Sequence, residues 1–186
     1  MPRRRARPAR AELAGRPDVR CFIAAWPDAG ARQRCAELTH ALRPHAEHGR
    51  VMRPENLHLT LAFIGDLPDA VGAKVAGACG ALPPLACDWQ LTQIGFFARP
   101  RVLWAGGLLM PDLGEIASRA RALLDALQVG YDRKPFVPHV TLLRDVRRFD
   151  GPREIAPPID WPIREVALYR SGRDEQGARY VRVEPT

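Results

Sequence analysis

Hydrophobic positions in this chain form short apolar runs that alternate with segments of helical spacing. Residues 19–26 make an apolar run that is closed by Pro27-Asp28, and this pattern predicts a buried strand. Asp28 can cap a helix that follows, and Pro44 and Gly49 mark the end of that helix. One face of this helix is predicted to carry Ala31, Cys35, Leu38 and Leu42.

Similar patterns predict two further helices and six further strands. One helix begins at Pro68-Asp69, and the other begins at Asp112, where Asp112 and Glu115 resemble a capping box, and ends at Gly130. The predicted strands lie at 56–65, 88–97, 101–108, 136–143, 162–170 and 178–184. Residues 145–161 are rich in Pro, Arg and Asp and are predicted to form a surface loop.

The order of these elements indicates the fold class. Helices and strands are interleaved, but the later strands follow one another through short turns, which favours an antiparallel α+β domain over a parallel doubly wound sheet. The chain contains no G-x-x-x-x-G-K-[ST] or G-x-G-x-x-G segment. The sequence therefore gives no support to a nucleoside-triphosphate or dinucleotide site.

Length and charge divide the chain into a short tail and a body. A chain of 186 residues normally forms one domain, which can have two lobes. The net charge is +7, but residues 1–17 carry six arginines and one glutamate, so the body at 18–186 is only about +2. We expect 1–17 to be a disordered Arg-rich tail, with a phosphate-attracting arm as the alternative, and 18–186 to be a single domain.

Cysteine usage and hydropathy bear on localisation. The four cysteines are scattered and form no C-x-x-C pair, which favours reduced thiols over a disulfide framework or a zinc site. No apolar run approaches 18 residues, and the Arg- and Pro-rich start has no apolar segment typical of a secretory signal. We therefore expect a cytoplasmic monomer that has no contact with a membrane.

The candidate chemistry lies in a repeated tetrad. Residues 58–61 read His-Leu-Thr-Leu and residues 139–142 read His-Val-Thr-Leu, both within predicted strands. Because side chains alternate between the faces of a strand, the histidine and threonine of each tetrad share one face and the aliphatic residues point into the core. If an internal pseudo-twofold relates the two strands, the four polar groups converge on one groove.

Two imidazoles in one groove suit phosphodiester chemistry. A neutral histidine can take a proton from an attacking water, and a protonated one can give a proton to the departing oxygen, because the imidazole pKa is about 6.5. The hydroxyls of Thr60 and Thr141 can donate hydrogen bonds to the phosphate oxygens. No cluster of acidic residues accompanies His58 and His139 at metal-ligand spacing, so we expect no metal and no cofactor.

A single H-x-T-x segment in a strand is weak support for catalysis, since a polar histidine beside a strand-favouring threonine is common. Two copies with the same strand context, 81 residues apart, are stronger, because this separation is near half the body and suits a duplicated lobe. The other histidines are expected to be solvated side chains without a catalytic role: His40, His45 and His48.

With both tetrads, the sequence resembles the two-histidine phosphoesterases, and within them the bacterial and archaeal RNA 2′,3′-cyclic phosphodiesterases, also called 2′-5′ RNA ligases. The resemblance covers about residues 19–184. Besides the tetrads it rests on the segments at 21–27 (CFIAAWP), 54–57 (PENL), 100–104 (PRVLW), 134–138 (KPFVP), Arg144 and 177–180 (GARY).

The resemblance implies a bilobal α+β fold, with two pseudo-symmetric lobes of antiparallel sheet, helices on the outside and a central groove. It implies hydrolysis of an RNA 2′,3′-cyclic phosphate to a 2′-phosphomonoester, with reversible 2′-5′ ligation as a side activity. His58 would be the proton donor and His139 the proton acceptor. Thr60 and Thr141 would bind the phosphate, with Arg144 as a further contact or simply a solvated arginine.

Alternatives remain open at this point. The same mechanism could act on small cyclic nucleotides or on an ADP-ribose cyclic phosphate, and an RNA-binding module without turnover is a third hypothesis. RNA ends with a cyclic phosphate are the expected partners. Whether tRNA fragments are among these RNAs is left open. No residue is assigned to base stacking, because the available aromatics are expected to lie in the core: Trp26, Phe63, Phe96, Phe97 and Trp104.

Overall fold

The computed structural model describes residues 20–175 and 177–185, so the predicted tail at 1–17 lies outside the described residues. The described chain has three α-helices, α1 (Ala29–Leu42), α2 (Asp69–Gly80) and α3 (Pro111–Ala126), and two 3-10 turns, η1 (Arg43–His45) and η2 (Pro54–Asn56). Its strands are β1 (Cys21–Ala25), β2 (Ala46–Val51), β3 (Leu59–Gly65), β4 (Cys87–Phe97), β5 (Val102–Gly106), β6 (His139–Phe149), β7 (Glu154–Ile163), β8 (Ala167–Asp174) and β9 (Gly177–Arg182).

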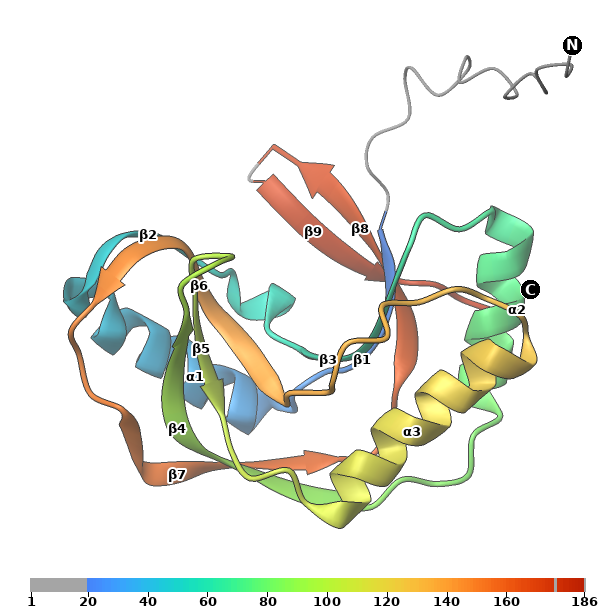
Figure 1. Cartoon of the computed structure of the whole chain (residues 1–186), viewed down its shortest axis with the longest axis horizontal. Helices are drawn as coiled ribbons and strands as arrows, with labels where there is room; N and C mark the ends of the chain where they lie inside the picture. Colours follow the sequence, from blue (N-terminus) through green and yellow to red (C-terminus); the bar gives the residue numbers. More distant parts are fainter. Residues whose placement is uncertain (1–19, 176, 186) are drawn as a thin grey trace, which may run out of the picture.

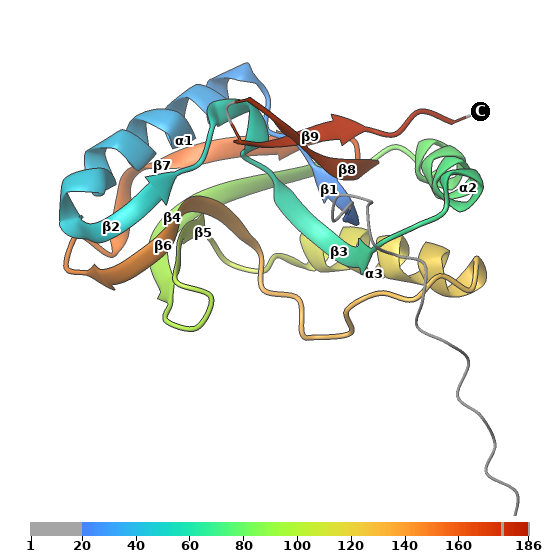
Figure 2. The same cartoon turned by 90° about the horizontal axis from the view of Figure 1, so that it is seen from above.

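All strand pairs recorded in the described chain are antiparallel, which confirms the predicted α+β class. The sheet order is β7-β4-β5-β6-β3-β1-β8-β9, and β2 pairs with β6. The sheet is narrowest between β3 and β6, where only Leu59 and Val140 are paired. Helix α1 packs on β7, β6 and β2, whereas α2 and α3 pack on β8 and β3 (Figures 1 and 2). The pseudo-symmetry of two lobes stays a prediction.

Helix α1 forms where its cap and its apolar spacing predict it. The Asp28 side chain accepts a hydrogen bond from the Ala31 amide at 2.7 Å and so satisfies one of the unpaired donors of the first turn. The buried positions of the helix include Ala31, Cys35 and Leu42, as expected. Thr39 is buried in place of Leu38, and its hydroxyl donates to the Cys35 carbonyl, so the buried stripe is rotated slightly.

The prediction of a surface loop at 145–161 is wrong. Strand β6 continues to Phe149, and β7 occupies most of the remaining segment and pairs with β4. Prolines are tolerated in β7 because it is an edge strand, where one side of the backbone needs no hydrogen-bond partner. The strand predicted at 162–170 is also divided, since β7 ends at Ile163 and β8 begins at Ala167. Strand β2 was not predicted.

The capping box predicted at the start of α3 is not formed. The helix begins at Pro111, where the missing N–H costs nothing because the first amides of a helix lack partners anyway. The cap residue is Met110, which makes no side-chain capping bond. Glu115 instead accepts a hydrogen bond from Arg119 one turn later, at 2.9 Å. The sequence predicts an apolar stripe on α3 that comprises Leu113, Ile116, Ala120, Leu123, Leu124 and Leu127. Four of these residues are buried, whereas Leu123 is partly buried and Leu127 is exposed.

The four cysteines are buried and unpaired, in agreement with the expectation of reduced thiols. Burial raises the pKa of each thiol, to about 12 for Cys35 and to about 11 for Cys79. None of the helices in the described chain is both long and apolar enough to cross a bilayer.

Candidate active site

The two tetrads meet where a single pair of residues joins β3 to β6. Leu59 and Val140, the second residue of each tetrad, are fully buried partners in an antiparallel pair. In this arrangement the residues on either side of such a pair lie opposite one another in reverse order. Each histidine therefore lies across from the threonine of the other tetrad, on the face turned away from the core. The structure thus brings the two tetrads together with their polar residues on one face, and their convergence on a single groove stays a prediction.

Both imidazoles are held in the same way. Nδ1 of His58 lies 2.7 Å from the carbonyl oxygen of Asn56, and Nδ1 of His139 lies 2.8 Å from the carbonyl oxygen of Val137. A carbonyl oxygen can only accept, so each Nδ1 carries the proton and donates it. In each ring Nε2 is therefore the remaining nitrogen, which accepts a proton when the ring is neutral and donates one when the ring is charged.

A β-bulge follows each tetrad and reverses the alternation of side chains. In β3, Thr60 and Ala62 pair with consecutive residues of β1, so that Leu61 and Ala62 are both buried. In β6 a register shift against β5 likewise leaves two consecutive residues, 142 and 143, buried. The fifth residue after each histidine consequently returns to the polar face. These residues are Phe63 and Arg144.

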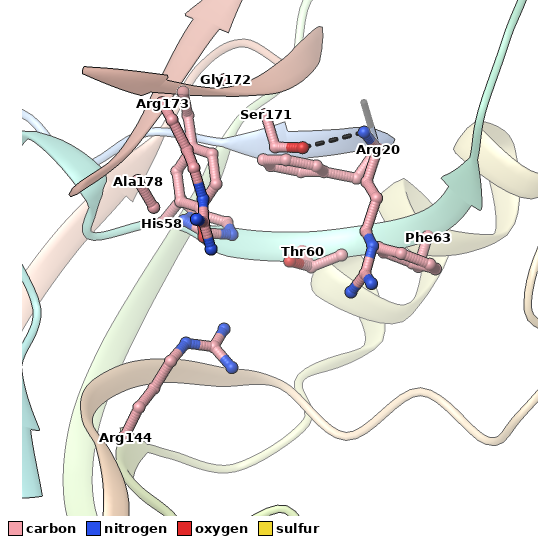
Figure 3. A pocket seen from close by; sticks show the side chains of 11 residues that line it. Arg20, His58, Thr60, Phe63, Arg144, Ser171, Gly172, Arg173 and Ala178 are labelled. Atoms are coloured by element: carbon pink, nitrogen blue, oxygen red, sulfur yellow. Dashed lines mark hydrogen bonds between the residues drawn. The ribbon is translucent and has the colours of Figure 1, made fainter. Parts of the chain in front are cut away.

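A cavity of about 620 Å³ opens over this face (Figure 3). Three arginines line it from three elements, namely Arg20 next to β1, Arg144 of β6 and Arg173 of β8, and no carboxylate is among the lining residues of the described chain. The remaining lining residues are Phe22, His58, Thr60, Phe63, Ser171, Gly172, Ala178 and Tyr180. The predicted residues His139 and Thr141 are not part of this lining. They lie beside it on the adjoining strand.

Arg144 is positioned between the predicted residues of both strands. Its guanidinium points across the cavity towards Thr60 and His58 (Figure 3). It lowers the pKa of His58 and also that of His139, which places its charge near both rings. Within residues 20–175 and 177–185, no ion pair or hydrogen bond of its side chain is recorded. This cation is therefore available to a bound anion.

His58 is packed within an aromatic cluster. Its ring stacks on Trp26 and on Phe22 with centroid distances of 5.0 and 4.9 Å, and it meets Tyr180 in a T-shaped contact with the centroids 5.1 Å apart. Desolvation by these neighbours, with the nearby charges of Arg144 and His139, lowers the pKa of His58 to about 4, although the Asn56 carbonyl opposes the shift. His58 is thus neutral at pH 7.

His139 has aromatic neighbours of its own. Phe97 and Trp104 form T-shaped contacts with its ring, at centroid distances of 5.2 and 6.1 Å. Burial, and secondarily the charge of Arg144, lowers the pKa of His139, against the effect of the Val137 carbonyl. Trp104 can lie across β4 because its partner there is Gly95, where a Cβ atom would overlap the indole. Several aromatics expected in the core therefore surround the two catalytic candidates.

The β8–β9 hairpin forms one wall of the cavity and is tied to the segment that carries His58. The Asn56 side chain donates to the carbonyl of Ala178 at 2.6 Å and accepts from the amide of Tyr180 at 3.2 Å. Asn56 is 3% exposed. The same residue therefore joins the hairpin through its side chain and holds the imidazole of His58 through its carbonyl.

A second connection lies further out on the same hairpin. Nη1 of Arg53 donates to both carboxylate oxygens of Asp174, at 2.9 and 2.8 Å, and Nε of Arg53 donates to Glu55. Hydrogen bonds between charged groups are stronger than those between neutral ones. The backbone of Glu55 in turn accepts a hydrogen bond from the Trp26 indole at 3.0 Å. The hairpin, the segment before β3 and the aromatic cluster are thus mechanically connected.

Sequence reasoning missed Asn56, Phe63 and Tyr180 as parts of the site. The sequence places Asn56 only within the segment at 54–57, and it assigns Phe63 to the core because Phe63 lies in an apolar strand. The bulge places Phe63 in the cavity with 40% of its surface exposed. The three other histidines, at positions 40, 45 and 48, do not line this cavity. In the part of the chain that is described, no three His, Cys, Asp or Glu side chains form a metal-binding group.

The family described as LigT like Phosphoesterase matches residues 26–104. A protein of Escherichia coli named RNA 2′,3′-cyclic phosphodiesterase is 31% identical over 139 residues, which cover 72% of this chain and 77% of that protein. The chain belongs to the LigT-like phosphoesterase family. The resemblance seen in the sequence is therefore confirmed, and the protein is an enzyme of the phosphodiesterase class.

Other members of the LigT-like family match over more of the chain. A Thermus thermophilus protein of the same name is 29% identical over 182 residues, which cover 89% of this chain and 88% of that protein. Among solved structures, E. coli LigT complexed with 3′-AMP has a TM-score of 0.79 and 26% identity, and the match covers 90% of this chain and 97% of that one. The fold of this LigT-like phosphoesterase is thus that of its relatives over almost its whole described length.

Proposed function

We propose that this LigT-like phosphoesterase hydrolyses the 2′,3′-cyclic phosphate at RNA ends to a 2′-phosphomonoester. The observation that carries the proposal is the pair of imidazoles on adjoining strands, each with Nδ1 bound to a carbonyl oxygen, beside an arginine-lined cavity. The relatives from E. coli and T. thermophilus are named for this activity.

In the proposed reaction a water attacks phosphorus while the bond from phosphorus to the 3′ oxygen breaks. His139 accepts a proton from the water at Nε2, and His58 donates a proton from Nε2 to the 3′ oxygen. The product carries a 2′-phosphate and a free 3′ hydroxyl. The two histidines end the reaction in exchanged protonation states, and solvent restores them.

The donor role requires a protonated His58, whose pKa its surroundings lower to about 4. A phosphate anion beside the ring favours the charged imidazole and offsets the desolvation. Substrate binding is therefore expected to raise the pKa of His58, so that the ring takes up from solvent the proton that it later donates. Negative charge that builds on the non-bridging oxygens would be stabilised by hydrogen bonds from the hydroxyls of Thr60 and Thr141 and from the guanidinium of Arg144.

The nucleoside would occupy the part of the cavity beyond the phosphate. A volume of about 620 Å³ accommodates a nucleotide. Phe63 offers an exposed aromatic surface there, and an aromatic ring can stack on any base. Because every base has such a face, this contact suits an enzyme that acts on RNA ends of varied sequence, with tRNA fragments among them.

The same site would support 2′-5′ ligation. If a 5′ hydroxyl replaces water, it attacks phosphorus, the bond to the 3′ oxygen breaks, and a 2′-5′ linkage forms. His139 and His58 keep the same proton roles. The water-accessible cavity favours hydrolysis where no second RNA end is bound, so ligation is proposed as the minor and reversible direction.

One experiment tests the main proposal. The protein is incubated, with EDTA present, with a short RNA ending in a 2′,3′-cyclic phosphate, and the position of the phosphate in the product is determined. His58→Ala and His139→Ala should each reduce turnover at least 100-fold, on the order of what a general acid or base contributes. His40→Ala is the matched control, because His40 is exposed on α1. A 3′-phosphate product, or full activity of either variant, would contradict the mechanism.

A second experiment separates the two proton roles. A phosphodiester with a p-nitrophenolate leaving group needs no proton on the departing oxygen. His58→Ala should therefore lose much less activity on this substrate than on RNA, whereas His139→Ala should lose as much on both. The opposite pattern would exchange the roles of the two histidines. If turnover occurs with cyclic mononucleotides and with no RNA, the alternative of a small cyclic substrate is favoured.

A further inference from the structure

A second, smaller cavity of about 110 Å³ adjoins the catalytic one. The two cavities share Arg144, Ala178 and Tyr180, so they lie on either side of these residues. Residues of β2 and of the segment after it line the far side, including Arg50 and Arg53. The volume is several times that of one water molecule, which occupies about 30 Å³ in the liquid, so a phosphate group has room there.

Two arginines that line this small cavity are cross-strand neighbours, which is an unusual arrangement. Arg50 and Arg144 are direct partners in the antiparallel pairing of β2 with β6, so their side chains lie on the same face. Like charges in that position destabilise a sheet. No carboxylate is among the residues that line the cavity in the described chain. An anion between the two guanidinium groups would remove this repulsion.

The carboxylate near Arg50 leaves its guanidinium largely available to bind an anion. The Arg50 side chain is 61% exposed and lies 3.7 Å from Asp145, which is also contacted by Arg101 at 3.6 Å. Exposed ion pairs of this kind contribute little, so Arg50 can exchange its partner. Arg53 differs, because its guanidinium is occupied by Asp174 and Glu55 and serves the hairpin wall.

We propose that the small cavity between Arg50 and Arg144 binds a second phosphate of the substrate, namely the phosphodiester that joins the terminal nucleotide to the preceding one. This inference rests on the proposed function, because it takes the large cavity as the site of the terminal phosphate. A contact with this second phosphate would favour oligonucleotides over mononucleotides. The arginine pair would thus determine the minimum length of the substrate.

The test is a binding measurement that does not depend on turnover. Calorimetry gives the Kd of adenosine 2′-phosphate and of the dinucleotide adenylyl-(3′→5′)-adenosine 2′-phosphate, for the wild type, Arg50→Ala, Arg50→Lys and Arg147→Ala. Wild type should bind the dinucleotide more tightly, and Arg50→Ala should reduce that preference about tenfold, as expected for one charge-assisted hydrogen bond. Arg50→Lys should retain part of it. Arg147→Ala removes an equal charge from an exposed position of β6 and should change nothing.

A dinucleotide with an uncharged methylphosphonate linkage identifies the group that Arg50 contacts. With this ligand, wild type and Arg50→Ala should bind equally, because the charge that Arg50 would meet is gone. The inference is overturned if Arg50→Ala weakens both natural ligands equally, or if wild type does not distinguish them. Failure of the proposed function would be seen separately, as absent turnover of an RNA with a cyclic phosphate. The Kd values of the two ligands could still be measured and compared in that case. A melting curve of Arg50→Ala verifies its fold.

Discussion

Leu59 and Val140 are backbone partners in the one recorded pairing between β3 and β6, and both are completely buried. This contact sets the register of the two candidate tetrads, because a shift by one residue would place the two histidines on opposite faces of the sheet. The geometry of the candidate site thus depends on two buried aliphatic residues. The four polar side chains gain their relative positions from the strands and not from contacts with one another.

The two threonines are expected to contribute to the chemical step. Thr60→Val and Thr141→Val retain shape and strand preference but remove a donor to the phosphate oxygens. Each should lower kcat roughly 10- to 100-fold, near the lower range for loss of one such donor. Steady-state kinetics on a short cyclic-phosphate RNA measures the effect. Thr92→Val on β4 should leave kcat unchanged, and an equal loss in that variant would indicate a general effect on the fold.

The buried imidazole of His58 should make stability depend on pH. The folded protein keeps His58 neutral down to about pH 4, whereas the unfolded chain protonates it near pH 6.5. Between these values the unfolded state binds more protons, so stability falls as the pH is lowered from 6.5 towards 4. Urea unfolding at several pH values should show a smaller loss over this window in His58→Gln than in the wild type. Equal slopes would mean that His58 titrates normally.

Asn56 is expected to be a positioning residue with a measurable structural contribution. Asn56→Ala leaves the Ala178 carbonyl and the Tyr180 amide without partners and should cost about 2 kcal/mol of unfolding free energy. Displacement of His58 should also lower kcat about tenfold, with little change in KM. Gln33→Ala, which removes an exposed hydrogen bond on α1, should stay within about 0.5 kcal/mol of wild type. A stability loss without any effect on kcat would limit Asn56 to a structural role.

Phe63 is expected to act on the nucleoside and not on the fold. Phe63→Ala should raise KM for RNA ends about tenfold, since one base stacked on an aromatic ring contributes about 1–3 kcal/mol. Phe63→Trp should retain the affinity. Because 40% of the side chain is exposed, the melting temperature should change little. Leu108→Ala, at a more exposed apolar position outside the cavity, is the control, and a KM unaffected by Phe63→Ala would remove the ring from the binding site.

The sequence was sufficient to predict the catalytic candidates because strand alternation is a local property. The spacing of histidine and threonine at two residues places both on one face wherever a strand forms, and both tetrads lie at the start of strands. The convergence of the tetrads could only be assumed, since it depends on the pairing of Leu59 with Val140, which are 81 residues apart.

The residues that were missed depend on departures from regular structure. Phe63 and Arg144 reach the polar face through bulges, and a bulge shifts the alternation without a clear mark in the sequence. Arg144 was identified through resemblance, whereas Phe63 was placed in the core. The segment at 145–161 is predicted to be a loop because it is rich in Pro, Arg and Asp, but prolines do not exclude an edge strand such as β7.

Burial of all four thiols has a practical consequence. Maleimides and similar reagents react with an accessible thiolate, and each native cysteine is both enclosed and shifted towards the neutral thiol. A cysteine introduced at an exposed position, such as Arg179 on the hairpin that forms the cavity wall, would therefore be labelled selectively in the native protein. A fluorophore there would report on any change at the hairpin when the proposed RNA substrate binds.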